Sequence, residues 1–181
     1  MKKFLLLCSV AASAAFGLSS CEKLEDAIFE SFQAPISFEV SIPVVTNTTS
    51  EVALGEAAVR FNLDSMIRVQ TGNVFGADVV GNMQIKEIGM EVIEGNATSN
   101  LANFAYVKMS VAASGTTPVE MGPFSIPTTA TGSVSFPVNN SFNIKSLFSG
   151  STVNFKVIGK ARTATTQTMK VRVNTMVAFD R

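Results

Sequence analysis

The feature that most constrains the fold is a two-residue alternation of apolar side chains near the C-terminus. It runs through Phe155, Val157, Gly159 and Ala161, and again through Met169, Val171, Val173, Thr175, Val177 and Phe179. Successive side chains of a β-strand point to opposite faces, so each run would bury one face and expose the other. The sequence therefore predicts two strands, and the polar stretch TATTQT at 163–168 between them predicts a hairpin.

The same alternation recurs upstream in short runs broken by Gly, Pro and Asn. The apolar positions are Ile36, Phe38, Val40 and Ile42; Val59, Phe61 and Leu63; Ala105, Val107, Met109 and Val111; and Val134, Phe136 and Val138. The run at 83–95 changes parity after Ile85, which predicts a β-bulge near Lys86 and Glu87. Gly122 and Pro123 interrupt 119–126, which we expect to form an edge strand.

About eight strands follow one another with no strand–helix–strand rhythm. This pattern predicts an all-β fold, a two-sheet antiparallel β-sandwich of the immunoglobulin-like kind. We expect one or two short helices: 63–72, begun by Asp64 or Ser65 and ended by Gly72, and 141–148. The spacing of apolar residues in 22–33 indicates a further amphipathic helix or a tether.

The N-terminus is typical of an exported protein. Lys2 and Lys3 precede an uncharged run, 4–18, which is shorter than the roughly 20 residues that span a bilayer. Leu18-Ser19-Ser20-Cys21 resembles the bacterial lipobox, and this resemblance implies cleavage before Cys21 and a lipid on its sulfur. The alternative is ordinary secretion, with cleavage at the A-x-A motif 12–14 and a free thiol at Cys21.

The chain is thus expected to comprise a signal peptide at 1–20, a lipidated tether or short helix at 21–34, and a β-sandwich at 35–181. Acidic residues Glu22, Glu25 and Asp26 resemble a surface-export signal of Bacteroidota lipoproteins, or are simply favourable charges at a helix start. The order of lipobox, amphipathic segment, "SFEVSIPV", "NLDSMIRVQTGNVFG" and "VNFKVIGKARTATTQTMKVRV" resembles small Bacteroidota outer-membrane lipoproteins with an all-β domain. This resemblance implies a location and a fold, but no activity.

The composition excludes several kinds of catalytic site. The chain has no His, Cys8 lies in the leader, and Cys21 would carry lipid, which excludes a Ser-His-Asp triad, a Cys-His pair and a His-built zinc site. No cofactor is expected.

Glu87 and Glu91 share a strand face, but their positions lie roughly 13 Å apart at about 3.3 Å per residue. This separation is larger than that between the two catalytic carboxylates of glycosidases. We expect them, with Glu94, to form a solvent-exposed face.

Five basic residues and one aromatic pair are the remaining candidates. Lys156, Lys160 and Arg162 share a face of one C-terminal strand, and Lys170 and Arg172 share a face of the other. In a hairpin these like charges would face each other, which disfavours pairing. They would bind an anionic glycan, lipid headgroup or protein, or be neutralised by acidic residues of a neighbouring strand, which we favour.

Tyr106 and Phe104 form an outward platform or, as we favour, the second face of a buried strand.

These observations favour a non-enzymatic module, lipid-anchored at the outer membrane, that binds an envelope protein or glycan or supports an assembly. The side of the membrane stays open. Without Lys2 and Lys3 the chain has 12 basic and 14 acidic side chains, a net charge of −2, which does not suggest nucleic acid. The alternatives are a carboxylate-dependent enzyme acting on glycans and a pilus-type subunit that exchanges an edge strand, 35–45 or 119–126.

Overall fold

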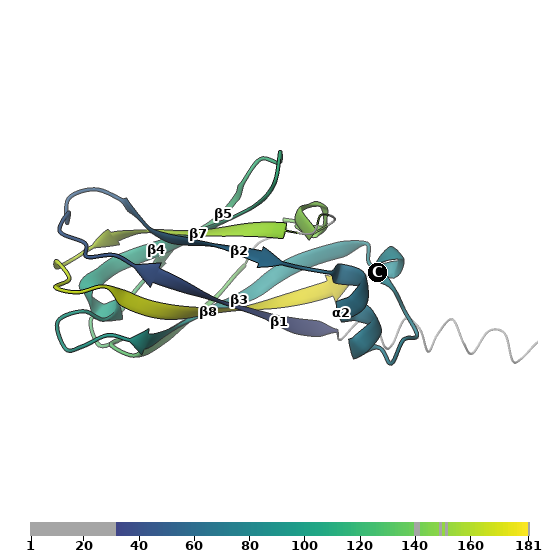
Figure 1. Cartoon of the computed structure of the whole chain (residues 1–181), viewed down its shortest axis with the longest axis horizontal. Helices are drawn as coiled ribbons and strands as arrows, with labels where there is room; N and C mark the ends of the chain where they lie inside the picture. The colour runs from purple at the N-terminus through teal and green to yellow at the C-terminus, as the bar shows by residue number, and fades with distance from the viewer. Residues whose placement is uncertain (1–31, 140–141, 149, 151, 181) are drawn as a thin grey trace, which may run out of the picture.

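The computed structural model describes residues 32–139, 142–148, 150 and 152–180. It contains eight β-strands in two four-stranded sheets that face each other (Figure 1). Sheet A has the order β1-β8-β3-β6 and sheet B the order β2-β7-β4-β5, and every pairing is antiparallel. The predicted all-β sandwich is confirmed. The signal peptide, Cys21 and residues 22–31 of the expected tether lie outside the described residues, and the last two residues of that tether, Gln33 and Ala34, belong to β1.

The strands and helices have the following bounds. The strands are β1 (Gln33–Ile42), β2 (Val52–Arg60), β3 (Asn82–Glu94), β4 (Phe104–Ala113), β5 (Val119–Ser125), β6 (Ser133–Pro137), β7 (Thr152–Ala161) and β8 (Met169–Asp180). The helices are α2 (Leu63–Gln70) and three 3₁₀ turns, η1 (Ala77–Val79), η2 (Leu101–Asn103) and η3 (Lys145–Phe148). Within the described part of the chain, no helix is long and apolar enough to cross a membrane.

The core lies between the sheets and follows the alternation of the sequence. On β1 every second residue from Ala34 to Ile42 is buried, and on β8 the same holds from Met169 to Phe179. Phe38 of sheet A stacks on Phe155 of sheet B with ring centroids 4.4 Å apart, which joins the two layers. The expected bulge is present too, because Ile85 pairs with Val177 and Glu87 with Met176, which leaves Lys86 unpaired in the register.

The predicted C-terminal hairpin is wrong. β7 pairs with β2 and β4 in sheet B, whereas β8 pairs with β1 and β3 in sheet A. The segment 162–168 therefore crosses from one sheet to the other. Alternation fixes which face of a strand is buried but not which strand it pairs with, and a polar connection of this length spans the roughly 10 Å between packed sheets.

The loops and helices gather at two opposite ends of the sandwich (Figure 1). At the end that we call the tether pole, β1 begins, β8 ends, and α2 and η1 pack beside them. The opposite end, the loop pole, consists of the connections 43–51, 95–103, 126–132 and 162–168. The chain therefore enters and leaves the domain at the same pole.

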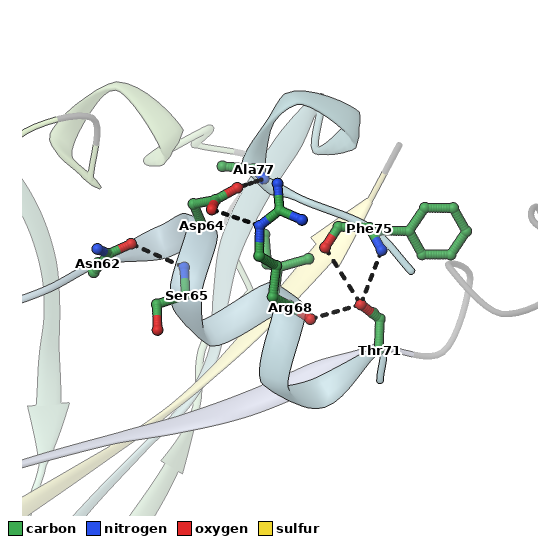
Figure 2. A network of polar contacts seen from close by, with 8 residues as sticks. Asn62, Asp64, Ser65, Arg68, Thr71, Phe75 and Ala77 are labelled. Carbon is green, nitrogen blue, oxygen red and sulfur yellow. Dashed lines mark hydrogen bonds and ion pairs between the residues drawn. The ribbon is translucent and has the colours of Figure 1, made fainter. Parts of the chain in front are cut away.

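Helix α2 begins with a different cap from the one predicted. The Asn62 side chain accepts a hydrogen bond from the Ser65 backbone N–H at 2.8 Å, so neither Asp64 nor Ser65 is the N-cap (Figure 2). Asp64 instead accepts from Arg68 Nε at 2.7 Å and from the Ala77 N–H at 3.0 Å. The Asp64 carboxylate thus fixes η1 against the helix. The pKa of Asp64 lies below its usual value because Arg68 and the Ala77 amide stabilise the charged form.

Candidate functional site

The five basic residues do not form one patch, because they divide between the two sheets. Lys170 and Arg172 lie on the outer face of sheet A, where Glu39 contacts Lys170 Nζ at 2.7 Å and Arg172 at 3.4 Å. Glu91 lies on the other side of Arg172 at 3.5 Å. The Lys170 hydrogen bond, with the charges of Lys170 and Arg172, lowers the pKa of Glu39. Acidic residues of the neighbouring strands neutralise this pair, which is the alternative that the sequence favoured.

The other three basic residues belong to β7 and its end. Lys156 lies opposite Glu56 in the register, and Lys160 lies opposite Tyr106. The Arg162 guanidinium donates to the backbone carbonyls of Ala102 at 2.8 Å and of Ile126 at 2.9 Å. Arg162 therefore joins two connections of the loop pole through its guanidinium.

The aromatic pair of β4 divides as well. Phe104 is fully buried in the core, but a register irregularity between Phe104 and Tyr106 turns the tyrosine to the outer face of sheet B. Its hydroxyl donates to Glu51 at 2.8 Å, and Lys108 contacts the same carboxylate at 2.6 Å. Lys108 and then Tyr106 lower the pKa of Glu51. The expected burial holds for Phe104 and is wrong for Tyr106.

The acidic residues of β3 lie on its exposed side, as expected. Glu87 accepts a hydrogen bond from the Ser135 hydroxyl, and Glu91 contacts Arg172. Glu94 is exposed at the end of the strand. Among the described residues, no group of three or more acidic, His or Cys side chains is placed to hold a metal ion.

The loop pole holds a network of buried polar side chains that the sequence did not predict. Asn103 lies at its centre and is 8% exposed. Its Nδ2 donates to Thr163 Oγ1 at 3.0 Å and to the carbonyls of Ala164 at 3.1 Å and Thr98 at 3.3 Å. Its Oδ1 accepts from the Asn100 N–H at 2.9 Å. One amide therefore fixes the connection 95–103 against the connection 162–168.

Two further side chains extend the network. Ser99 Oγ is fully buried and accepts from the backbone N–H groups of Thr166 at 2.9 Å and Gln167 at 3.1 Å. Thr165 Oγ1 accepts from the Val45 N–H at 2.8 Å, which brings in the connection 43–51. Buried polar groups that are fully bonded make a region rigid and give it one structure. The loop pole is therefore a set of mutually held connections.

A shallow, open groove of about 560 Å³ lies beside this network. It is lined by Val92, Ile93, Gly95, Asn96, Ala97, Asn100, Thr131 and Gly132. None of these side chains is ionisable, and Asn100 is 8% exposed with its amide bonded to Asn96, Ala97 and Ala102. The groove therefore offers apolar surface, the Asn96 amide and the Thr131 hydroxyl. Such a lining suits recognition of an uncharged polar chain, because hydrogen bonds give orientation and apolar contacts give affinity.

The sequence carried a weak signal for this region. Asn100 and Asn103 form a capping box around η2. The Asn100 side chain accepts from the Ala102 N–H, and the Asn103 side chain accepts from the Asn100 N–H. The Asn-x-x-Asn spacing just before a strand indicates such a cap. It does not indicate that Asn103 also reaches a connection 60 residues further along the chain.

Comparisons with known proteins give no family. No family model and no curated protein matches the chain. Among solved structures, a cyanophage Pam1 capsid chain is 12% identical over 82% of this chain and 85% of its own, with a TM-score of 0.37. A Parabacteroides distasonis protein described as secreted is 11% identical over 76% of this chain and 48% of its own, with a TM-score of 0.39. Likenesses at these values carry no inference about function.

Proposed function

We propose that this chain is a non-enzymatic, lipid-anchored β-sandwich of the bacterial outer membrane that binds an envelope protein or glycan through its loop pole. The observation that carries the proposal is the opposite placement of the chain entry and the groove. The described chain begins at the tether pole, and the ten residues 22–31 separate its first residue, Phe32, from Cys21. The groove and its polar network lie at the other pole.

This placement gives the two ends different tasks. β1 runs the length of the sandwich with ten residues, a span of roughly 33 Å at about 3.3 Å per residue. A lipid on Cys21 would hold the tether pole near the bilayer and point the loop pole away from it. Connections mounted on a rigid scaffold are the usual place for binding residues.

The chemistry of the groove suggests the class of partner. Its uncharged lining favours a partner without strong charge, such as sugar hydroxyls or the backbone of an extended peptide. A catalytic role has less support, because the chain has no His and the acidic side chains of β3 spread along one exposed strand. Lys170 and Arg172 of sheet A are already neutralised by Glu39 and Glu91.

The anchor is tested by labelling cells with a lipid precursor. We expect the wild-type protein to incorporate the label and Cys21→Ser to lose it. Label absent from the wild type, or retained in Cys21→Ser, would refute the anchor. Protease treatment of intact cells then shows on which side of the membrane the domain lies.

The binding surface is tested with two matched substitutions. Ala97 is exposed and lines the groove, and Ala58 is exposed on β2, away from it. After mild cross-linking on cells, we expect Ala97→Arg to lose the stoichiometric partner found by mass spectrometry and Ala58→Arg to keep it. Equal capture by both variants would refute binding through the loop pole.

A further inference from the structure

Two apolar side chains stand out at the tether pole. Val69 on α2 is 75% exposed and Val74 in the turn after it is 68% exposed. They are the most exposed of the large apolar side chains in the described part of the chain. A single exposed valine is ordinary, but two close in sequence at the pole where the chain enters need a physical reason.

The turn that presents Val74 is held rigidly. Thr71 Oγ1 donates to the Ile67 carbonyl at 2.7 Å and accepts from the Phe75 N–H at 3.2 Å (Figure 2). The Asn73 N–H bonds the Arg68 carbonyl at 2.6 Å. Ile67 and Phe75 on either side are buried. The fold therefore anchors both sides of this turn in the core while leaving Val74 outside.

The charges around α2 do not form a cationic surface. Asp64 and Arg68 close an ion pair at 2.7 Å, and Asp78 adds a further negative charge beside Arg68. Lys145 of η3 donates to the Val80 backbone carbonyl. A surface of this kind has no electrostatic preference for anionic lipid, so any contact with a membrane would depend on its apolar side chains.

The tether brings this surface to the bilayer. Residues 22–31 separate Cys21 from Phe32, and ten residues reach at most about 35 Å when fully extended. The point where the chain enters the domain would thus stay within about 35 Å of the lipid. Anchoring makes a second contact intramolecular, so an apolar contact too weak to bind a free domain to the membrane becomes populated.

We infer that α2 and the turn after it lie against the bilayer, with Val69 and Val74 inserted at the boundary between the lipid headgroups and the acyl chains. This inference rests on the proposed lipid anchor and adds an orientation to it. The anchored domain stands upright on its tether pole, and the loop pole faces away from the membrane.

The chain contains no Trp, so a single introduced Trp reports its own surroundings. The lipidated full-length chain would carry Val69→Trp or Val74→Trp, with Val44→Trp at the loop pole as the matched control, since Val44 is 48% exposed. Each protein would be reconstituted in vesicles of phosphatidylcholine whose acyl chains are brominated, and in vesicles that also contain phosphatidylglycerol.

We expect Trp fluorescence at positions 69 and 74 to shift to the blue and to be quenched by brominated lipid, equally with and without phosphatidylglycerol. The Val44→Trp variant should keep the emission of a solvent-exposed Trp in both vesicles. Quenching at 69 and 74 no greater than at 44 would overturn the inference, as would a blue shift already present in detergent-free, delipidated protein. Because lipid incorporation is measured on the same samples, loss of the anchor itself is distinguished from failure of the pole to contact the bilayer.

Discussion

Truncation of Asn103 tests whether buried side-chain amides hold the loop pole together. Asn103→Ala removes four hydrogen bonds: those to Thr163 Oγ1, the Ala164 carbonyl and the Thr98 carbonyl, and the one from the Asn100 N–H. Each such bond contributes about 1 kcal/mol net, and a buried group left without a partner costs more. Water can reach the exposed Thr163, so we expect a loss of about 2–3 kcal/mol.

The assay is thermal or urea unfolding, with Asn143→Ala as a matched control. The Asn143 side chain makes three hydrogen bonds, one fewer than Asn103: its Oδ1 accepts from the N–H groups of Met83 and Lys145, and its Nδ2 donates to the Gly81 carbonyl. Unlike Asn103, Asn143 is exposed, and it lies at the other pole. Water replaces an exposed amide more readily, so this control should lose about 1 kcal/mol. For a domain of this size, Asn103→Ala should lower Tm by about 5–10 °C.

Hydrogen exchange separates a local effect from a general one. In Asn103→Ala, three backbone amides should lose protection from exchange before the strands do: those of Asn100, Thr166 and Gln167. The first donates to Asn103 Oδ1 in the wild type, and the other two donate to Ser99 Oγ. Equal Tm losses in the two Asn→Ala variants, with protection of these amides unchanged, would refute the reasoning. The connections of the loop pole would then be held without a contribution from Asn103.

Three further outcomes follow from the core and the charges. Gly55 has φ +156°, and a Cβ at this position would lie 2.4 Å from Val40 Cγ1. Gly55→Ala should therefore destabilise the domain by about 1–3 kcal/mol in a urea titration, and a smaller loss would show that β1 and β2 can separate there. Phe155→Ala removes a fully buried ring stacked on Phe38 and should cost about 3–5 kcal/mol by the same titration, unless the sheets close on the cavity. Because the pKa of Glu39 is lower in the folded state than its unfolded value of 4.5, ionised Glu39 stabilises the fold above pH 4.5. The free energy of unfolding should therefore fall as the pH drops below that value, and it should fall less in Glu39→Gln. Since the chain has no His, the free energy of unfolding should change little between about pH 6 and 8.

Much of the fold could be predicted from the sequence because alternation is a local property. The burial of β1 and β8 and the bulge at Lys86 follow from the order of apolar and polar residues along each strand. The edge position of β5 follows from the Gly122-Pro123 pair within it. None of these features requires knowledge of a distant partner.

The parts that could not be predicted depend on partners far away in the chain. The crossing of 162–168 between the sheets is supported by Thr165 bonding Val45 and by Asn103 bonding Thr163, contacts between residues 120 and 60 positions apart. The cap of α2 failed for a nearer reason: Asn62, Asp64 and Ser65 are all good N-cap residues, and Asp64 is engaged by Arg68 and Ala77 instead. The prediction that the five basic residues face one another failed because it assumed that β7 pairs with β8, whereas the two strands lie in different sheets.

The position of β1 also decides how the domain responds to force. β1 is an edge strand of sheet A, its first residue lies at the tether pole, and all ten of its residues pair with β8. A pull between an N-terminal anchor and a partner held at the loop pole acts along the strands, whereas the hydrogen bonds between strands run across them. The whole β1–β8 ladder would then resist in shear, with its bonds sharing the tension at once instead of opening one after another. A domain anchored at its N-terminus and bound at its loops would therefore resist unfolding when the two ends are pulled apart.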